Sequence, residues 1–308
     1  MIATDLDGTL LRDDGSLSEF TRSVIETCRA LGIKFVIATG RSNALKVAPS
    51  EMFDGRITSN GAMAKIGNTV VYDKRIHYET SRPVLAACNQ HGIKIAFNAG
   101  GTHYANFVMS DYWPWFKSSD FHIVDFAAHE HFAEKLFSPD CTDEDRLYIE
   151  RLIPKELYTV VTSDTTGDFL QVMHKDATKG KAVLALAEHW KIPASEVVTF
   201  GNDYNDIDML ASVRHSVAVE NAPDEVKSAA SYICGSNEED GPAKWISENV
   251  LKYERNDLRR CCNEMQKHAL GGRITPPSVY ACVLARRGYS SSRLILLHPP
   301  ATKILCKT

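Results

Sequence analysis

Short apolar runs alternate with amphipathic segments along most of the chain. The apolar run "MIATDL" at residues 1–6 is followed by a segment whose apolar positions recur at helical spacing, and then by a second apolar run, "KFVIATG". This order predicts a β-α-β unit of a parallel sheet, in which the helix covers one face of the sheet. The predicted buried face of the helix consists of Phe20, Val24, Cys28 and Leu31.

Local signals mark both ends of this predicted helix. Ser16 and Glu19 have the spacing of a capping box, in which each side chain accepts a hydrogen bond from the other residue's backbone N–H. Gly32 is expected to stop the helix, because glycine readily adopts the left-handed conformation that closes a helix. The helix is therefore expected to start just after Ser16 and to stop at Gly32.

The same alternation returns in the second half of the chain. "KGKAVLALAEHW" and "DIDMLA" have the pattern of helices, whereas "VVTFG" and "SVAV" have the pattern of buried strands. "APDEVKSAA" follows as a further helix, with Pro223 near its start. Residues 1–79 and 176–251 are therefore predicted to form one α/β domain with a doubly wound, Rossmann-like parallel sheet.

Residues 80–175 have a different pattern, of strands joined by turns and a few helices. "IKIAFN" and "THYANFV" flank the pair Gly100–Gly101, and "YTVVTS" and "FLQVMH" flank "DTTG", which are hairpin signals. This stretch is predicted to be an inserted α+β domain. The aromatic residues of "DYWPWF" are expected to form its core, with a share in closing over a ligand as the alternative. His129 and His131 are interpreted as an exposed pair, because no third metal ligand is evident.

Composition narrows the class of protein. The 308 residues are 44% hydrophobic and 24% charged, which is typical of a globular protein. No apolar run reaches the roughly eighteen residues that a membrane span needs, and the first residues do not resemble a signal peptide. The eight cysteines include no C-x-x-C spacing. We therefore predict free thiols, a cytoplasmic location and no membrane partner.

The formal net charge of −4 conceals an asymmetry. Residues 1–251 hold 24 Lys and Arg against 36 Asp and Glu, whereas residues 252–308 hold 11 against 3. An acidic body is unsuited to nucleic acid, whose binding depends on clustered basic side chains, so no nucleic-acid partner is expected. Residues 252–308 show no helical or strand period. We expect them to be a basic tail that is disordered or not native to the protein.

Side chains with chemical potential follow the predicted strands. Asp5 and Asp7 follow the first strand, Thr39 ends the second, and residues 202–206 follow the strand "VVTF". The carboxyl ends of the strands in an open α/β sheet meet at the edge where ligands bind. Lys179 opens a predicted helix that follows the insertion. Although an Asp-Gly pair alone is typical of a surface turn, the joint arrangement predicts one site.

These residue types suit the transfer of a phosphoryl group from a monoester. Asp5 would attack phosphorus as the nucleophile, and Asp7 would donate a proton to the leaving oxygen and later accept one from water. Mg²⁺ would be held by Asp5, the backbone carbonyl of Asp7 and the acidic loop near residue 203, because this cation prefers oxygen ligands. Lys179 and Thr39 would hold the phosphate oxygens.

The sequence resembles the haloacid dehalogenase superfamily, and in particular Cof-like phosphatases with an inserted cap domain of the C2B type. "DLDGTLL", "ATGR", the lysine of "ATKGKA" and "GNDYNDIDML" resemble the four motifs of that superfamily in order. "TSNGA", "NAPDEVKSAA" and "SNEEDGPA" extend the similarity over residues 1–250. The resemblance implies Mg²⁺-dependent hydrolysis of small phosphorylated metabolites, commonly sugar phosphates, with residues 80–175 as the cap that closes over the substrate.

The resemblance also implies a set of site residues. The catalytic residues would be Asp5, Asp7, Thr39 and Lys179, the substrate-binding residues Leu6, Gly40, Arg41, Asn60 and Asn205, and the metal ligands Asp5, Asp7, Asn202, Asp203 and Asp206. The fourth motif usually reads Gly-Asp, whereas here Asn202 follows Gly201 and an aspartate stands at position 203. Either Asn202 or Asp203 is therefore expected to be the metal ligand of this loop.

The sequence thus predicts a Mg²⁺-dependent phosphatase that hydrolyses a small phosphorylated metabolite through an aspartyl-phosphate. A monomer or weak homodimer is expected. A phosphomutase of the same superfamily, and a protein that binds a phosphorylated metabolite at an impaired metal site, are the alternatives. Release of free phosphate, isomerisation of a sugar phosphate, and binding without turnover would separate the three.

Overall fold

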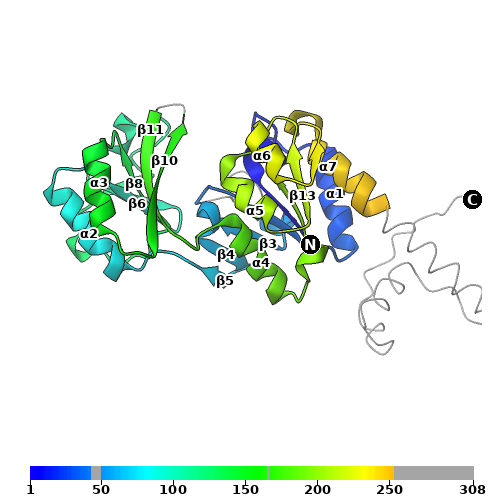
Figure 1. Cartoon of the computed structure of the whole chain (residues 1–308), viewed down its shortest axis with the longest axis horizontal. Helices are drawn as coiled ribbons and strands as arrows, with labels where there is room; N and C mark the ends of the chain where they lie inside the picture. Colours follow the sequence, from blue (N-terminus) through cyan, green and yellow to red (C-terminus); the bar gives the residue numbers. More distant parts are fainter. Residues whose placement is uncertain (43–49, 165–166, 253–308) are drawn as a thin grey trace, which may run out of the picture.

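The computed structural model describes residues 1–42, 50–164 and 167–252. These residues form two units, each built on its own sheet (Figure 1). The predicted basic tail lies outside the described residues apart from Lys252. Within the described ranges, no helix has the length and apolar character needed to cross a membrane.

The larger sheet has eight strands in the order β14-β13-β12-β1-β2-β3-β4-β5. The six strands from β14 to β3 are parallel, and β4 and β5 continue the sheet as antiparallel strands at one edge. The strand order extends in both directions from β1, which confirms the predicted doubly wound arrangement. The strands are β1 (Ile2–Thr4), β2 (Phe35–Ala38), β3 (Gly55–Thr58), β4 (Met63–Ile66), β5 (Thr69–Asp73), β12 (Val198–Gly201), β13 (His215–Val219) and β14 (Tyr232–Cys234).

Helices cover both faces of this sheet, because successive side chains of a strand point to opposite faces. Ile2 packs with side chains of α1 and α7 in one core, whereas its neighbour Ala3 packs with side chains of α4 and α5 in the other. Both cores are needed to bury a parallel sheet. The helices of this unit are α1 (Glu19–Ala30), α4 (Lys179–His189), α5 (Ile207–Ala211), α6 (Asp224–Ala229) and α7 (Gly241–Ile246).

The start of α1 differs from the prediction. Its N-cap is Ser18, whose hydroxyl accepts a hydrogen bond from the Thr21 backbone N–H at 3.0 Å, so the predicted capping box at Ser16 is wrong. Val24 and Cys28 are buried as expected, but Phe20 is 43% exposed. Two serines precede the helix at alternate positions, and only the second lies at the distance that a cap requires.

The inserted unit contains a six-stranded sheet in the order β10-β11-β9-β6-β7-β8, antiparallel except for the pair β7 and β8. Both predicted hairpins are present: Ala99 pairs with Thr102 across the two glycines, and Asp164 pairs with Gly167. The elements are α2 (Tyr78–Gln90), β6 (Ala96–Ala99), β7 (Thr102–Ala105), β8 (Phe121–Ile123), β9 (Lys135–Pro139), α3 (Asp143–Leu152), β10 (Leu157–Asp164) and β11 (Gly167–His174).

The two faces of the inserted sheet bury different side chains. One face packs against α2 and α3, and the other packs against a cluster that includes Trp113 and Phe137. Trp113 therefore belongs to the core, as predicted, whereas Trp115 is 55% exposed. The interpretation of an exposed histidine pair is wrong for His129, which is buried and packs against Phe97, and burial lowers its pKa to about 4.

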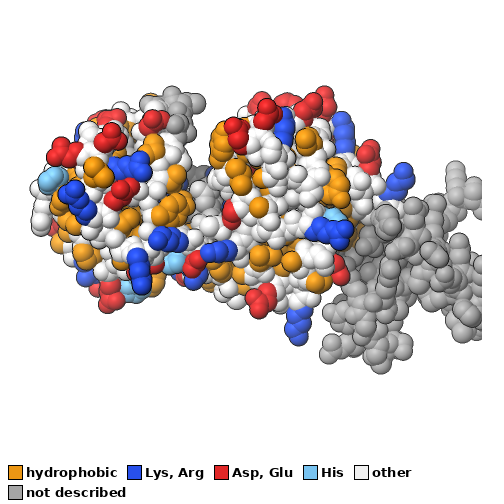
Figure 2. All heavy atoms as spheres, in the orientation of Figure 1, with side chains coloured by type: hydrophobic (Ala, Val, Ile, Leu, Met, Phe, Trp, Pro, Cys, Tyr) orange, Lys and Arg blue, Asp and Glu red, His pale blue; other side chains and the backbone are white. Residues whose placement is uncertain are grey.

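Two chain segments connect the units, before α2 and after β11. Ile76 of the first segment forms an isolated antiparallel bridge with Ala133 of the inserted unit, through backbone hydrogen bonds of 2.7 and 2.9 Å. Figure 2 shows that the molecular surface narrows between the units, and that acidic and basic side chains are interspersed over this face of both. The bridge fixes the inserted unit close to the turn that follows β3.

That turn makes a close approach to the start of α4. Gly61 has a φ of +95°, and a Cβ at this position would lie 2.2 Å from the carbonyl oxygen of Thr178. Thr178 is the N-cap of α4, with its hydroxyl accepting from Lys181 N–H. Only glycine fits here, because both the backbone conformation and the neighbouring carbonyl exclude a side chain.

We expect Gly61→Ala to lower the melting temperature by about 6 °C or more, because overpacking adds to left-handed strain. Gly67→Ala is the matched control, since Gly67 has a φ of +55° and a Cβ at that position would meet no atom within 4 Å. The control should lose only about 2–4 °C. Calorimetry of both variants measures the difference, and equal shifts would contradict the close approach at Thr178.

Candidate active site

The first aspartate pair lies where β1 ends. Asp5 follows the last residue of β1, and its backbone N–H donates to the Phe200 carbonyl of β12 at 3.0 Å. Asp5 is buried, whereas the Asp7 side chain is 47% exposed. Leu6 lies between them with its side chain fully buried in the core. Only the backbone of Leu6 is thus available for the predicted contact with substrate.

Lys179 forms the centre of a buried ionic group. Its Nζ donates to Asp5 Oδ1 at 2.8 Å and to Asp206 Oδ1 at 2.7 Å, and it contacts Asn205 Oδ1 at 3.4 Å. The side chains of Lys179 and Asp206 have no exposed surface. Burial alone would lower the pKa of Lys179, but Asp206 and Asp5 reverse this effect and raise it. The lysine is therefore a permanent positive charge between two carboxylates.

The same environment acts on Asp5 in the opposite direction. Burial removes water from its carboxylate and raises the pKa of Asp5 to about 7, although Lys179 opposes this shift. The nearby Asp206 raises the pKa further. A second positive charge next to Asp5 would therefore favour its ionised, nucleophilic form.

The loop after β12 is organised by Asp206. Asp206 Oδ2 accepts hydrogen bonds from the backbone N–H groups of Asn202 and Asp203, at 2.9 and 3.1 Å. The Asp203 carboxylate accepts from Tyr204 N–H at 2.7 Å and so caps the following helical turn. Both oxygens of Asp206 are hydrogen-bonded, and the Asp203 carboxylate points to the backbone of its own helical turn. Neither carboxylate points toward Asp5 with an oxygen that lacks a hydrogen bond.

Asn202, by contrast, reaches the end of β1. Its Oδ1 lies 3.0 Å from the carbonyl oxygen of Asp7 and 3.2 Å from Asp5 Oδ2, and it accepts from Thr9 Oγ1 at 2.8 Å. Three oxygen acceptors this close repel one another unless a positive group lies among them. An exchange of the Asn202 amide N and O would also satisfy them, with the amide donating to both oxygens.

The spacing of these oxygens fits a magnesium ion. An octahedral Mg²⁺ with ligands at 2.0–2.1 Å places neighbouring ligand oxygens about 2.9 Å apart. The distances from Asn202 Oδ1 to Asp7 O and to Asp5 Oδ2 are close to that value. A carboxylate, a backbone carbonyl and a side-chain amide are ligands that this hard cation accepts. The residues present therefore fit the cation.

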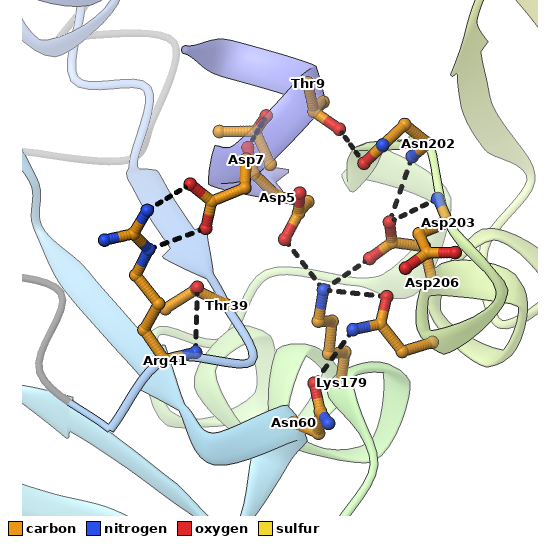
Figure 3. A network of polar contacts seen from close by, with 12 residues as sticks. Asp5, Asp7, Thr9, Thr39, Arg41, Asn60, Lys179, Asn202, Asp203 and Asp206 are labelled. Carbon is orange, nitrogen blue, oxygen red and sulfur yellow. Dashed lines mark hydrogen bonds and ion pairs between the residues drawn. The ribbon is translucent and has the colours of Figure 1, made fainter. Parts of the chain in front are cut away.

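Arg41 holds Asp7 away from Asp5. Its Nε and one terminal nitrogen each lie 2.7 Å from a carboxylate oxygen of Asp7, a bidentate arrangement that raises the pKa of Arg41 (Figure 3). Thr39 Oγ1 accepts from the Arg41 backbone N–H at 3.1 Å, which shapes the loop after β2. The structure thus brings the predicted residues Thr39, Arg41 and Asp7 to the same edge of the sheet.

Asn60 and Asn205, two further predicted site residues, are hydrogen-bonded to each other beside Lys179. Asn205 Nδ2 donates to Asn60 Oδ1 at 3.0 Å, while Asn205 Oδ1 faces Lys179. Gly40 lies under Asn60, since a Cβ on Gly40 would be 2.9 Å from Asn60 Oδ1. Asn60 and Asn205 are therefore linked to the lysine that contacts Asp5.

The structure adds residues to which the sequence assigned no role. Thr9 orients the Asn202 amide, and Asn221 Nδ2 donates to the Gly8 carbonyl at 2.9 Å. Asp208 Oδ2 accepts from Gly180 N–H at 2.9 Å and so fixes the start of α4. Thr9 and Asp208 lie within the quoted motifs, and Asn221 begins another similar stretch, so their spacing was the available signal.

We expect Lys179→Met to lower the free energy of unfolding by about 3 kcal/mol or more at pH 8, because two buried carboxylates lose their counter-ion. The carboxylates of the variant should have raised pKa values in the folded state. Its deficit should therefore shrink as pH falls from 8 to 5 and protons neutralise them. Chemical denaturation at both pH values measures this difference.

Lys181→Met is the control on the same helix. The Lys181 side chain is 54% exposed and pairs with Asp176 at the surface, so its loss should cost at most about 1 kcal/mol at either pH. A deficit of Lys179→Met that stays constant between pH 5 and 8 would contradict the buried ionic group.

Comparison with known proteins identifies the family. The family profile of haloacid dehalogenase-like hydrolases matches residues 2–246. The 5-amino-6-(5-phospho-D-ribitylamino)uracil phosphatase YcsE of Bacillus subtilis is 29% identical over 259 residues, covering 82% of this chain and 96% of that protein. The 5-amino-6-(5-phospho-D-ribitylamino)uracil phosphatase YbjI of Escherichia coli is 26% identical over 266 residues, covering 82% of this chain and 97% of that protein.

Solved structures agree. The sugar phosphatase BT4131, of subclass IIB of the superfamily, is 27% identical, with a TM-score of 0.62 over 80% of this chain and 97% of that chain. A structure from work on the trigonal-bipyramidal intermediate of a phosphoryl-transfer superfamily is 26% identical, with a TM-score of 0.63 over the same shares. The chain belongs to the haloacid dehalogenase-like hydrolases and is a phosphatase whose inserted α+β unit is the cap of that fold.

Proposed function

We propose that this phosphatase hydrolyses the phosphate monoester of a small metabolite, a sugar phosphate, with Mg²⁺ at the end of β1 and Asp5 as the transient phosphoryl acceptor. The convergence of Asp5 Oδ2, the Asp7 carbonyl and Asn202 Oδ1 carries this proposal, because the first two oxygens lie 3.2 and 3.0 Å from Asn202 Oδ1, a spacing that suits that cation. Relatives named as a sugar phosphatase and as phosphatases of a phosphorylated ribitylamino compound support the substrate class.

In the proposed site, Mg²⁺ supplies positive charge beside Asp5 and the substrate phosphate. Asp5, the backbone carbonyl of Asp7, and Asn202 would hold it. Asp206 acts through the loop: its carboxylate bonds the backbone that carries Asn202 and also fixes Lys179. Asp203 caps the helical turn that follows. We therefore assign the role of ligand to Asn202 and a supporting role to Asp206.

The chemistry proceeds in two steps. An oxygen of the Asp5 carboxylate attacks phosphorus, and the ester P–O bond breaks, with its electrons leaving on the alcohol oxygen. Asp7 supplies the proton that this oxygen needs. Water then attacks the phosphorus of the aspartyl-phosphate, Asp7 accepts a proton from it, and free phosphate and the Asp5 carboxylate are regenerated.

Arg41 has two tasks in this scheme. It binds the Asp7 carboxylate in the structure, and its partly exposed guanidinium also faces the solvent above the site. A substrate phosphate or hydroxyl that takes over one of its hydrogen bonds frees Asp7 to reach the leaving oxygen. Thr39, Gly40, Asn60 and Asn205 form the adjoining wall for substrate, and Lys179 offsets the charge of the phosphate oxygens.

A panel of sugar phosphates, incubated with the protein and either Mg²⁺ or EDTA, tests the proposal through release of free phosphate. Mg²⁺-dependent release from at least one of them is expected. Isomerised sugar phosphate without free phosphate would indicate a mutase, and binding without turnover would indicate an impaired site.

Asp5→Asn should lower the rate of phosphate release by about 10³-fold or more, because an amide is a poor nucleophile. The substitution keeps the shape of the side chain, and an amide oxygen can still accept a hydrogen bond from Lys179. The melting temperature should therefore change little. Asp14→Asn, at an exposed position, should retain the full rate, and a similar rate in Asp5→Asn would refute the covalent step.

Asn202→Asp should lower the Mg²⁺ concentration for half-maximal activity by about tenfold, because a negative ligand attracts the cation more strongly. Asp203→Asn should leave that concentration within about twofold of the wild type, since its carboxylate is turned to Tyr204 N–H. A Mg²⁺ titration of activity measures both. A large increase for Asp203→Asn, with no change for Asn202→Asp, would make Asp203 the ligand.

A further inference from the structure

A carboxylate of the cap is buried against the catalytic unit. Glu134 has no exposed surface, and its hydrogen-bond donors are neutral groups: the Ser59 hydroxyl, the Asn98 amide at 3.0 Å and the Gly100 backbone N–H at 3.1 Å. Burial raises the pKa of Glu134, although the hydrogen bonds from Ser59 and Gly100 and the positive charges of Arg75 and Lys135 oppose the shift. A buried carboxylate whose hydrogen-bond donors are all neutral is costly, so a hydrophobic residue would stabilise this contact at least as well.

The position of Glu134 is fixed by its neighbours. Its backbone N–H donates to the Asn98 carbonyl at 2.8 Å, and the preceding residue, Ala133, pairs with Ile76 of the connecting segment. Asn98 and Gly100 belong to the cap, whereas Ser59 follows β3 of the catalytic sheet. The hydrogen bond from Ser59 to Glu134 therefore joins the two units at the point where the chain passes between them.

The residue that Glu134 contacts belongs to a strained turn. Ser59 and Asn60 have φ values of +50° and +57°, a left-handed conformation that costs a residue other than glycine about 1–2 kcal/mol. Two backbone hydrogen bonds tie this turn to the loop after β2: Ser59 N–H donates to the Arg41 carbonyl, and Asn60 N–H donates to the Thr39 carbonyl. A side-chain bond on Ser59 helps to hold a conformation that the chain alone disfavours.

The turn leads directly to the nucleophile. Asn60 Oδ1 accepts from Asn205, Asn205 faces Lys179, and Lys179 donates to Asp5 (Figure 3). Asn60 is carried by this turn and bonds Asn205, which contacts Lys179. A shift of the turn would therefore move Asn60 at the wall of the site and change the contact of Asn205 with Lys179. Within the part of the chain that the structure describes, the Ser59 hydroxyl contacts the cap at Glu134 and, at 3.5 Å, at the Asn98 amide, so the cap acts on this series through Ser59.

We propose that Glu134 is a positioning residue for the phosphatase reaction. Through the Ser59 hydroxyl, the cap holds the Ser59–Asn60 turn in place. This turn fixes the positions of Asn60 and Arg41 relative to Lys179 and Asp5. Glu134 does not touch the substrate in this role. The geometry of the catalytic site thus depends on the position of the cap. A carboxylate is required because both of its oxygens accept hydrogen bonds, Oε2 from Ser59 and Asn98 and Oε1 from Gly100, and an amide nitrogen accepts none. The inference rests on the proposed function, since its readout is phosphate release.

The test compares Glu134→Gln and Ser59→Ala with the wild-type protein, using p-nitrophenyl phosphate and saturating Mg²⁺. Each variant should lower kcat by about tenfold or more, because each removes or weakens the same contact, with a smaller change in KM. Ser138→Ala is the matched control: Ser138 is buried, and its hydroxyl donates to the Lys94 carbonyl at 2.5 Å within the cap. It should lower the melting temperature as much as Ser59→Ala does and leave kcat unchanged.

The double variant supplies the sharper measurement. If Glu134 and Ser59 act through one contact, the double variant should be no slower than the slower single variant, whereas independent effects multiply. Multiplied effects, or a wild-type kcat in Ser59→Ala, would overturn the inference. Should Glu134→Gln fail to fold, Ser59→Ala decides alone, because it removes only a hydroxyl. A wild-type protein that releases no phosphate from any substrate with Mg²⁺ would instead refute the proposed function.

Discussion

The buried group of Lys179, Asp5 and Asp206 is the constraint on which the site depends. Lys179 is the first residue of α4, where the helix dipole disfavours a positive charge, and it is removed from water. Two carboxylates, Asp5 at the end of β1 and Asp206 in the loop after β12, stabilise the charge at that position. The close approach of Gly61 to Thr178, and the hydrogen bond from Gly180 N–H to Asp208, hold the start of α4 at the required place. The fold thus holds a buried lysine at a position that is unfavourable for stability and that suits the binding of a phosphate group.

The placement of these residues was predictable because it follows from backbone direction. Parallel strands bring their carboxyl ends to one edge, so Asp5, Thr39 and the loop after β12 had to meet there. Which groups these side chains bond to was not predictable from the sequence. Each side chain has several possible partners nearby, and the rotamer that it adopts decides between them. Asp7 turns to Arg41, and Asp206 bonds Lys179 and the loop backbone. Similarly, spacing allowed a cap at Ser16, but the chain enters α1 two residues later.

Contacts between the cap and the catalytic unit lay further beyond sequence reasoning. Glu134 and Ser59 are 75 positions apart. Ser59 lies within the stretch "TSNGA", but Glu134 stands in no pattern that distinguishes it from an ordinary polar residue. His129 likewise alternates with His131 along an extended segment, yet only one of them is buried against Phe97. The contact of His129 lies within the cap, whereas the contact of Glu134 with Ser59 depends on how one folded unit packs against the other. Contacts between the units can also couple the position of the cap to the geometry of the catalytic site.

The neutral side chain at position 202 changes the balance between cation and phosphate in the proposed site. With Lys179 protonated and both Asp5 and Asp206 ionised, two negative charges face one positive charge. A divalent cation makes this group net positive, which attracts a phosphate monoester and favours the ionised form of Asp5. An aspartate at 202 would cancel that excess charge, and the cation would be held more firmly while the phosphate was attracted less. Asn202 therefore weakens the hold on the metal and, by the same charge, strengthens the attraction for the substrate.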